Sequence, residues 1–218
     1  ELRNPMGVIN GYAGFLARRL GGDAQSKDAV DSIISEIKVM DEIIREFMSF
    51  AQPTELNITE VDINGVADEA VRALPAETGR ERPEFHPAEG LPRIQGDFVL
   101  LRQVFVNLVK NAVEATHGGG SVSISTSSVD GGQELRGLPH GSYVRVEVSD
   151  TGDGIDEQNL NKIFMPFFTT KAHGTGLGLA LVQKILVYHG GRAFVKSKKG
   201  KGTTFNIYLP VRSRAREA

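Results

Sequence analysis

The sequence predicts an α+β protein, in which an antiparallel helical hairpin precedes an α/β sandwich with one sheet and helices on one face. Two observations predict this class. The first fifty residues carry apolar residues at heptad spacing, which is typical of helices packed side by side. The remainder mixes alternating, strand-like stretches with amphipathic, helix-like ones and has no regular βαβ repeat, which favours a single sheet with helices gathered on one side.

Two heptad seams predict the hairpin. Their apolar residues alternate in spacing between three and four: Leu2, Met6, Ile9, Ala13, Leu16 and Leu20, then Val30, Ile33, Ile37, Met40, Ile44 and Phe47. Gly21, Gly22 and Asp23 interrupt the pattern and predict the turn. Two helices bury such seams poorly alone, whereas two hairpins paired into a four-helix bundle bury them well, so we expect a homodimer. The alternative is a hairpin that packs on its own second domain.

The rest of the chain is divided by a linker. We expect residues 1–51 to form the hairpin, 52–57 the linker, where Pro53 ends the helix, and 58–218 the second domain. Periodicity predicts helices over residues 66–74, 98–115 and 177–188, and strands over residues 121–127, 143–148, 192–197 and 203–209. Residues 130–141 read as a polar, glycine-rich loop. The connection over residues 150–176 is unusually long for a passive loop.

The composition excludes several classes of protein. The 218 residues include no cysteine, which excludes a disulfide scaffold, a thiolate zinc site and an iron–sulfur cluster. A net charge of −2 argues against a nucleic-acid partner. No stretch approaches the roughly 20 apolar residues that span a bilayer, so we expect no direct membrane contact. Because the first residue is Glu1, we expect the chain to be a piece of a longer protein.

A polar stripe on the helix over residues 98–115 is the first candidate site. Leu101, Val104, Phe105, Leu108 and Ala112 form the apolar face of this helix, and Gln103, Asn107, Asn111 and Glu114 form a polar one. Carboxamide oxygens in a row suit Mg²⁺, a hard cation that keeps several waters and shares phosphate oxygens. The alternative is an ordinary solvated helix face.

Two glycine clusters enclose a phenylalanine-rich segment. Asp150, Gly152 and Gly154 directly follow a predicted strand, where a carboxylate can accept a hydrogen bond from an amino group and glycines let backbone approach a ligand; the alternative is a plain turn.

The second cluster contains Gly174, Gly176 and Gly178 and opens a helix, whose free N–H groups suit phosphate. Its spacing is neither the dinucleotide fingerprint nor a P-loop. Three phenylalanines lie between the clusters: Phe164, Phe167 and Phe168. They suit a lid that docks on the core and releases; the alternative is that they simply pack in the interior.

In this order, and with Gly202-Thr203-Thr204-Phe205 on the last strand, these features resemble the sensor histidine kinases of two-component systems. The ATP-binding part looks like the Bergerat (GHKL) fold. The family's N box matches QVFVNLVKNAVEA, its first glycine box VSDTGDGI, its F box FMPFFTTK and its second glycine box GTGLGLALVQKIL. The start, ELRNPMGVINGYAGFL, looks like the H box. The FMSFAQP segment and the FFTTK lid look most like the nitrogen-regulation type.

The resemblance implies ATP and Mg²⁺ as cofactors. Asn111, assisted by Asn107, would coordinate Mg²⁺ that bridges the phosphates; Asp150, supported by Thr203, would bind the adenine amino group. Lys110 and Lys171 would neutralise phosphate charge. The resemblance implies that the other ATP-binding residues are Gly152, Gly154, Ile155, Phe168, Thr170, Gly174, Thr175, Gly176, Leu177 and Gly178.

Asn107 stands where GHKL ATPases carry a glutamate base. A neutral amide activates water poorly, which favours transfer over hydrolysis.

The family's phospho-acceptor histidine would immediately precede Glu1. Glu1 would accept the proton of that imidazole, and Asn4, one turn on, would hold water near a phosphorylated residue. In the family this Glu-x-x-Asn arrangement goes with phosphatase action on a response regulator. The alternative is an ordinary helix surface. Without the histidine, we expect this chain not to autophosphorylate at the conventional site.

The sequence therefore predicts the core of a sensor histidine kinase, cytoplasmic in location, with a second copy and a response-regulator receiver domain as partners. Membrane anchoring of the parent protein would depend on the upstream part. Two alternatives stay open: a GHKL ATPase or serine kinase, and a dimeric scaffold that binds nucleotide without transfer.

Overall fold

The computed structural model describes residues 8–9, 11–16, 24–51, 55–74, 82–117, 119–131, 138–171 and 174–211. The chain divides into two compact units. One contains residues 1–53 together with 169–177, and the other contains residues 54–168 together with 178–218.

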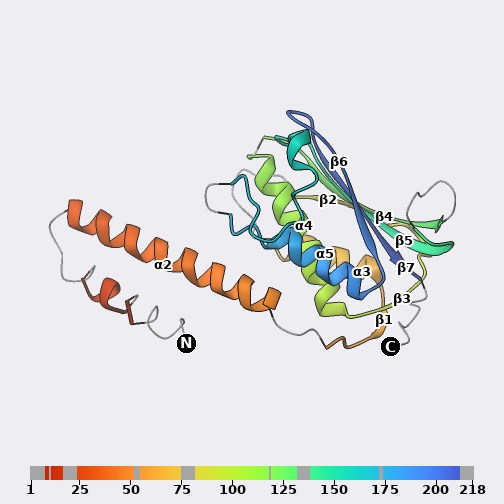
Figure 1. Ribbon diagram of the computed structural model, residues 1–218, viewed down its shortest axis with the longest axis horizontal. Helices are drawn as coiled ribbons and strands as arrows, with labels where there is room; N and C mark the ends of the chain where they lie inside the picture. Colours follow the sequence, from red (N-terminus) through yellow and green to blue (C-terminus); the bar gives the residue numbers. More distant parts are fainter. Residues whose placement is uncertain are drawn as a thin grey trace. The chain divides into compact units, whose positions relative to one another are not determined.

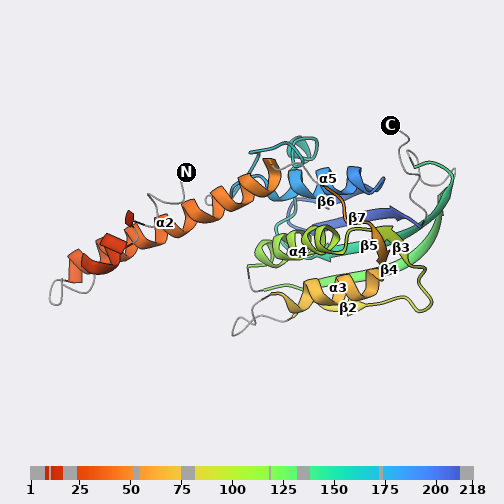
Figure 2. The same cartoon turned by 90° about the horizontal axis from the view of Figure 1, so that it is seen from below.

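The first unit is mainly helical. Helix α2 spans Ala24–Ala51, and residues 8–9 and 11–16 are helical and lie beside its first half in both views (Figures 1 and 2). Among the described residues of the two seams, Ala13, Val30 and Ile37 are buried. Five others remain 46–51% exposed: Ile9, Leu16, Ile33, Met40 and Phe47. The turn predicted at residues 21–23 lies outside the described residues.

The second unit is a two-layer sandwich. Its five-stranded sheet has the order β2-β4-β5-β7-β6, with β2 parallel to β4 and every other pair antiparallel. The strands are β2 (Glu84–His86), β4 (Val122–Gly131), β5 (Gly141–Asp150), β6 (Arg192–Lys198) and β7 (Gly202–Pro210). Strands β1 (Thr59–Val61) and β3 (Ile94–Gly96) form a separate antiparallel pair. Helices α3 (Ile63–Arg72), α4 (Phe98–Ala115) and α5 (Gly178–Tyr188) lie together over one face of the large sheet (Figure 2).

The core lies between the sheet and these helices. Along β5 the valines at 144, 146 and 148 are buried and alternate with half-buried Arg145 and Glu147. All five residues predicted for the apolar face of α4 are at most 4% exposed. The α+β class and the helix-covered sheet are therefore confirmed.

The elements differ from the prediction mainly in their ends. Helix α3 begins at Ile63 because the Asp62 carboxylate accepts a hydrogen bond from Asn64 N and caps the helix. Strands β4 and β5 extend into the predicted loop. Strands β1, β2 and β3 were not predicted, since three residues are too few to show alternation. A short 3₁₀ helix, η1 (Glu157–Asn159), follows the first glycine cluster.

No helix in the described part of the chain has both the length and the apolar character needed to cross a membrane.

Candidate functional site

Asp150 is a buried carboxylate at the last residue of β5. It is 7% exposed. One of its oxygens, Oδ1, accepts hydrogen bonds from Gly152 N at 2.9 Å and from Thr203 N at 3.2 Å. Backbone N–H donors to a carboxylate are strong, charge-assisted bonds. The carboxyl group is therefore held in a fixed orientation between its own loop and the neighbouring strand β7.

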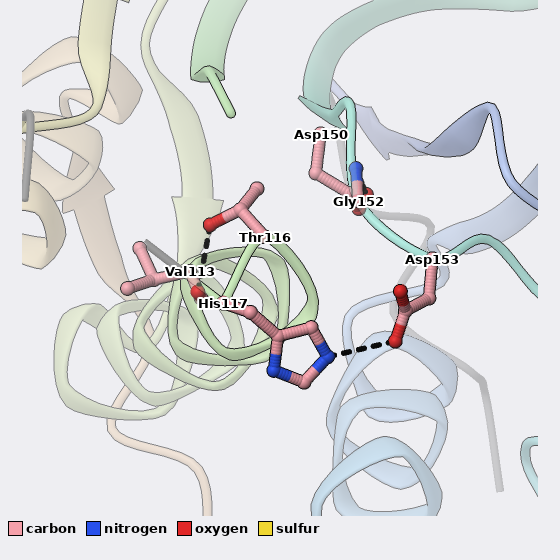
Figure 3. A network of polar contacts seen from close by, with 6 residues as sticks. All are labelled: Val113, Thr116, His117, Asp150, Gly152 and Asp153. Carbon is pink, nitrogen blue, oxygen red and sulfur yellow. Dashed lines mark hydrogen bonds and ion pairs between the residues drawn. The ribbon is translucent and has the colours of Figure 1, made fainter. Parts of the chain in front are cut away.

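The loop that follows Asp150 is fastened to the end of α4. Asp153 N donates to Ala115 O at 3.1 Å. A Cβ atom at Gly152 would collide with that same carbonyl, so only glycine allows this approach. His117 Nε2 lies 2.8 Å from Asp153 Oδ2, and Figure 3 shows this pair bridging the end of the helix and the loop.

The other side of the loop is fastened to the hairpin between β6 and β7. Gly200 N donates to Asp153 O at 2.6 Å, and Ile155 N donates to Ser197 Oγ at 2.7 Å. Gly154 has φ +65°, a conformation that side chains disfavour. The loop of the first glycine cluster is therefore hydrogen-bonded to both α4 and the hairpin, and it is not a free turn.

Thr203 and Ser197 complete this group. Thr203 is 5% exposed, and its hydroxyl lies 2.9 Å from Ser197 Oγ. No sequence motif points to Ser197. The register of the β6–β7 hairpin pairs Ser197 with Thr203 and would have indicated its place in the site. That register cannot be predicted from residue types alone.

The predicted polar stripe of α4 is half-buried along its whole length, at Gln103, Asn107, Asn111 and Glu114. It is therefore not a fully solvated face. Asn111 lies one turn before Ala115, where the Asp150 loop is attached, while Lys110 is exposed.

The amide oxygens of this stripe suit a magnesium ion that takes its remaining ligands from water and phosphate. Among the described residues, no group of three or more His, Asp or Glu side chains is placed to hold a metal.

The phenylalanine-rich segment is anchored at one end. Phe164 packs edge-on against Phe205, with ring centroids 6.4 Å apart. Phe167 is 63% exposed and has φ +66°, which is uncommon for a residue with a side chain. Phe168 is half-buried. Plain packing accounts for Phe164 but not for the exposed, strained Phe167.

The second glycine cluster belongs to the other compact unit, except for Gly178, the first residue of α5. Leu177 N donates to Thr175 Oγ1 at 3.2 Å. This bond forms an ST-turn just before the helix. Gly174 N donates to Lys171 O, and Gly176 has φ +68°. Thr170 and Lys171 are exposed. Glu1 and Asn4 lie outside the described residues.

Two family models match the chain. Residues 96–213 match the family described as histidine kinase-, DNA gyrase B- and HSP90-like ATPase, and residues 1–56 match the His Kinase A (phospho-acceptor) domain. The chain belongs to the sensor histidine kinases of this ATPase family.

Curated relatives of this sensor histidine kinase segment are considerably longer. Sensor histidine kinase ZraS of Escherichia coli K12 is 34% identical over 213 residues, which are 97% of this chain and 43% of the relative. Sporulation kinase E of Bacillus subtilis 168 is 33% identical over 219 residues, which are 100% of this chain and 28% of the relative. The chain therefore spans less than half the length of these relatives.

Two solved structures resemble the segment over nearly its whole length. One is full-length ShkA in complex with AMPPNP, with a TM-score of 0.74 and 27% identity over 96% of this chain and 44% of that one. The other is histidine kinase ThkA in complex with the response regulator protein TrrA, with a TM-score of 0.67 and 27% identity over 97% of this chain and 59% of that one.

Proposed function

We propose that this chain is the core of a two-component sensor histidine kinase. It binds ATP with Mg²⁺, serves transfer of the γ-phosphoryl group to a histidine, and passes that group to an aspartate of a response regulator. The observation that carries the proposal is the buried Asp150 carboxylate, which accepts hydrogen bonds from two backbone N–H groups at the start of the first glycine cluster and on β7. Matches to both family models support it.

Asp150 is the adenine-recognising residue of this proposal. A carboxylate with a fixed oxygen offers a directional acceptor to an exocyclic amino group, and its low exposure removes competing water. Thr203 and Ile155 are held beside it through Ser197, and Gly152 and Gly154 shape the pocket without side chains. Because Gly152 has no Cβ atom, the loop lies close against the end of α4.

Asn111 and Asn107 are the magnesium ligands of this proposal. The bound ion would neutralise charge on the phosphates, which is the main requirement of phosphoryl transfer. Lys110 and Lys171 add positive charge. The backbone from Gly174 through Thr175, Gly176 and Leu177 to Gly178 cradles the phosphates, and Phe168 and Thr170 belong to the lid. A neutral amide at Asn107 favours transfer over hydrolysis.

The partners proposed are a second copy of the chain and a receiver domain. Half-exposed seam residues such as Met40 and Phe47 support pairing of two hairpins into a four-helix bundle. The likeness to ThkA, solved with a response regulator, supports the second partner. The division into a hairpin (1–51), a linker (52–57) and an ATP-binding domain (58–218) is part of this proposal, as are the roles of Glu1 and Asn4.

The first arm of the test compares Asp150→Ala with Asp130→Ala, an exposed aspartate on β4. We expect the unsubstituted chain to bind AMPPNP with Mg²⁺ in isothermal titration calorimetry. Asp150→Ala should weaken binding about 10- to 150-fold, the range that loss of a hydrogen bond to a charged group produces. Asp130→Ala should bind normally. Equal affinity of both variants would contradict the role of Asp150.

The second arm follows the phosphoryl group itself. With a histidine placed before Glu1, labelled ATP should give an acid-labile protein label that Asp150→Ala abolishes and Asp130→Ala retains. Hydrolysis of ATP with no labelled histidine would instead support an ATPase. Binding with neither hydrolysis nor label would support a scaffold.

A further inference from the structure

His189 is a buried histidine in the ATP-binding unit, and none of the roles proposed above uses it. It is 2% exposed and stands directly after the last residue of α5. Gly190 follows with φ +65°, and Gly191 N donates to Leu186 O at 2.7 Å. This is the Schellman ending of a helix, and it places the His189 ring at a fixed point at the end of α5.

Both nitrogens of His189 have backbone partners. Nδ1 lies 2.8 Å from Ile185 O, and Nε2 accepts a hydrogen bond from Asp97 N at 2.9 Å. A carbonyl partner on one nitrogen and an N–H partner on the other require the neutral ring with its proton on Nδ1. Burial favours the same form, since it lowers the pKa of His189.

Asp97 joins this histidine to two further segments. Its Oδ1 accepts from Leu100 N at 3.1 Å and caps the first turn of α4, and its Oδ2 accepts from Asn57 N at 2.9 Å. Asn57 lies just before β1, where the chain enters the ATP-binding unit. One aspartate therefore ties together the start of α4, the end of α5 and the entering segment.

The space beside the His189 ring depends on a small residue at position 96. A Cβ atom at Gly96 would lie 3.1 Å from His189 Cδ2 and 2.8 Å from Leu101 Cδ1. This glycine has no left-handed backbone that would require it, so its small size is what matters. Glycine at this position lets the ring close against the junction of β3 and α4.

Helices α4 and α5 pack along each other in opposite directions, because the start of α4 meets the end of α5. Helix α5 has 11 residues, which makes it about 16 Å long. Gly178, at its other end, therefore lies toward the C-terminal half of α4, the half that carries Asn107 and Asn111. The bonds at His189 therefore lie at the opposite end of α5 from Gly178.

We propose that His189 and Asp97 form a latch that holds α5 against α4, joins both helices to the entering segment at Asn57, and thereby sets nucleotide affinity at the opposite end of the helix pair. The proposal rests on the ATP-binding function proposed above. His189 is a positioning residue in it, since it acts through the two helices.

The test uses the chain as it is and compares His189→Leu with His189→Gln. Leucine fills the space without an acceptor, whereas glutamine carries an oxygen that reaches the position of Nε2. His140→Leu, at an exposed histidine of the β4–β5 loop, is the matched control. The readouts are AMPPNP–Mg²⁺ affinity, measured below the melting temperature of every variant, and hydrogen exchange at the Asp97 and Asn57 amides.

We expect His189→Leu to weaken nucleotide binding about 2- to 30-fold, the range seen for residues that couple without touching ligand. Exchange at both amides should become faster. His189→Gln should restore most of the affinity and protection, and His140→Leu should change neither. Unchanged affinity in His189→Leu would overturn the proposal, and so would a glutamine variant as weak as the leucine one, because packing alone would then explain the loss.

Asp97→Asn keeps the test decisive if His189→Leu fails to fold. Asparagine caps helices as well as aspartate does, but its amide nitrogen cannot accept a second N–H. We expect faster exchange at Asn57 and weaker nucleotide binding, and normal affinity with faster exchange would overturn the coupling. If the unsubstituted chain binds no nucleotide, the proposed function fails, while the exchange data still show whether the latch exists.

Discussion

Contacts at three residues, Asp150, Gly152 and Asp153, fix the loop that follows β5. The carboxylate of Asp150 is oriented by two backbone N–H groups, and the Asp153 amide is fixed on the Ala115 carbonyl. The hydrogen-bonded pair of Asp153 and His117 has both side chains more than 60% exposed. Exposed pairs contribute little to stability, so the backbone bonds and the missing Cβ of Gly152 are the stronger fastening.

Gly152→Ala should lower the melting temperature and weaken nucleotide binding together. The added Cβ atom meets the Ala115 carbonyl, which is backbone and cannot move aside. Overpacking of this kind costs about 1–3 kcal/mol. Gly119→Ala is the matched control, because nothing lies within 4 Å of a Cβ atom there. Thermal melts with and without AMPPNP measure both effects, and equal melts for the two variants would disprove the steric explanation.

At the scale of elements, the ends of helices carry the functional connections. The C-terminal end of α4 receives the Asp150 loop, and its N-terminal end receives Asp97 and His189. Helix α5 starts at Gly178, the last glycine of the second cluster, and ends at Tyr188, directly before His189. Free N–H and C=O groups occur only at helix ends, so these are the places where other segments can be bonded to a helix.

The histidine at the end of α5 should make stability depend on pH. Burial lowers the pKa of His189 below its usual 6.5. Between the lowered value and 6.5 the unfolded chain therefore binds more protons than the folded one. The free energy of unfolding is then largest above that window and falls as the pH drops through it.

Urea unfolding at about pH 7.5 and about pH 5.5 measures this loss. His189→Gln should show a smaller loss than the unsubstituted chain, since glutamine does not titrate. If both proteins lose the same free energy of unfolding between the two pH values, His189 does not contribute and the explanation fails.

At the scale of the whole molecule, the helical unit leaves part of its apolar seam exposed. Ala13, Val30 and Ile37 are buried, whereas five described seam residues stay 46–51% exposed: Ile9, Leu16, Ile33, Met40 and Phe47. Apolar side chains repeated along a helical seam mark an interaction surface. A second hairpin with the same seam would cover them, which is the basis for the proposed homodimer.

Phe47→Glu should convert a homodimer into monomers. The side chain is 46% exposed in the single chain, and a carboxylate there would have to lose its water without a partner when two seams close. Ser35→Glu, at an exposed α2 position off the seam, should leave the dimer intact. Sedimentation equilibrium measures the masses. A Phe47→Glu protein that sediments like the Ser35→Glu protein would contradict pairing through this seam.

Periodicity along the chain was enough to predict the helices and strands that run over several turns or alternations. The predicted helix over residues 98–115 coincides with α4, and the strands that became β4 to β7 were found by alternation, because burial of one face imposes a period on residue types. The sequence also indicated Asp150 and both glycine clusters as candidates, since glycine marks unusual backbone.

The partners of these residues become visible only in the folded chain. Ser197 beside Thr203, His117 beside Asp153 and His189 beside Asp97 are pairs separated by 6, 36 and 92 residues. No local pattern encodes such pairs, because each depends on strand register or on how two helices meet. For the same reason β1, β2 and β3 were missed, as three-residue strands are stabilised by the partners they pair with rather than by their own sequence.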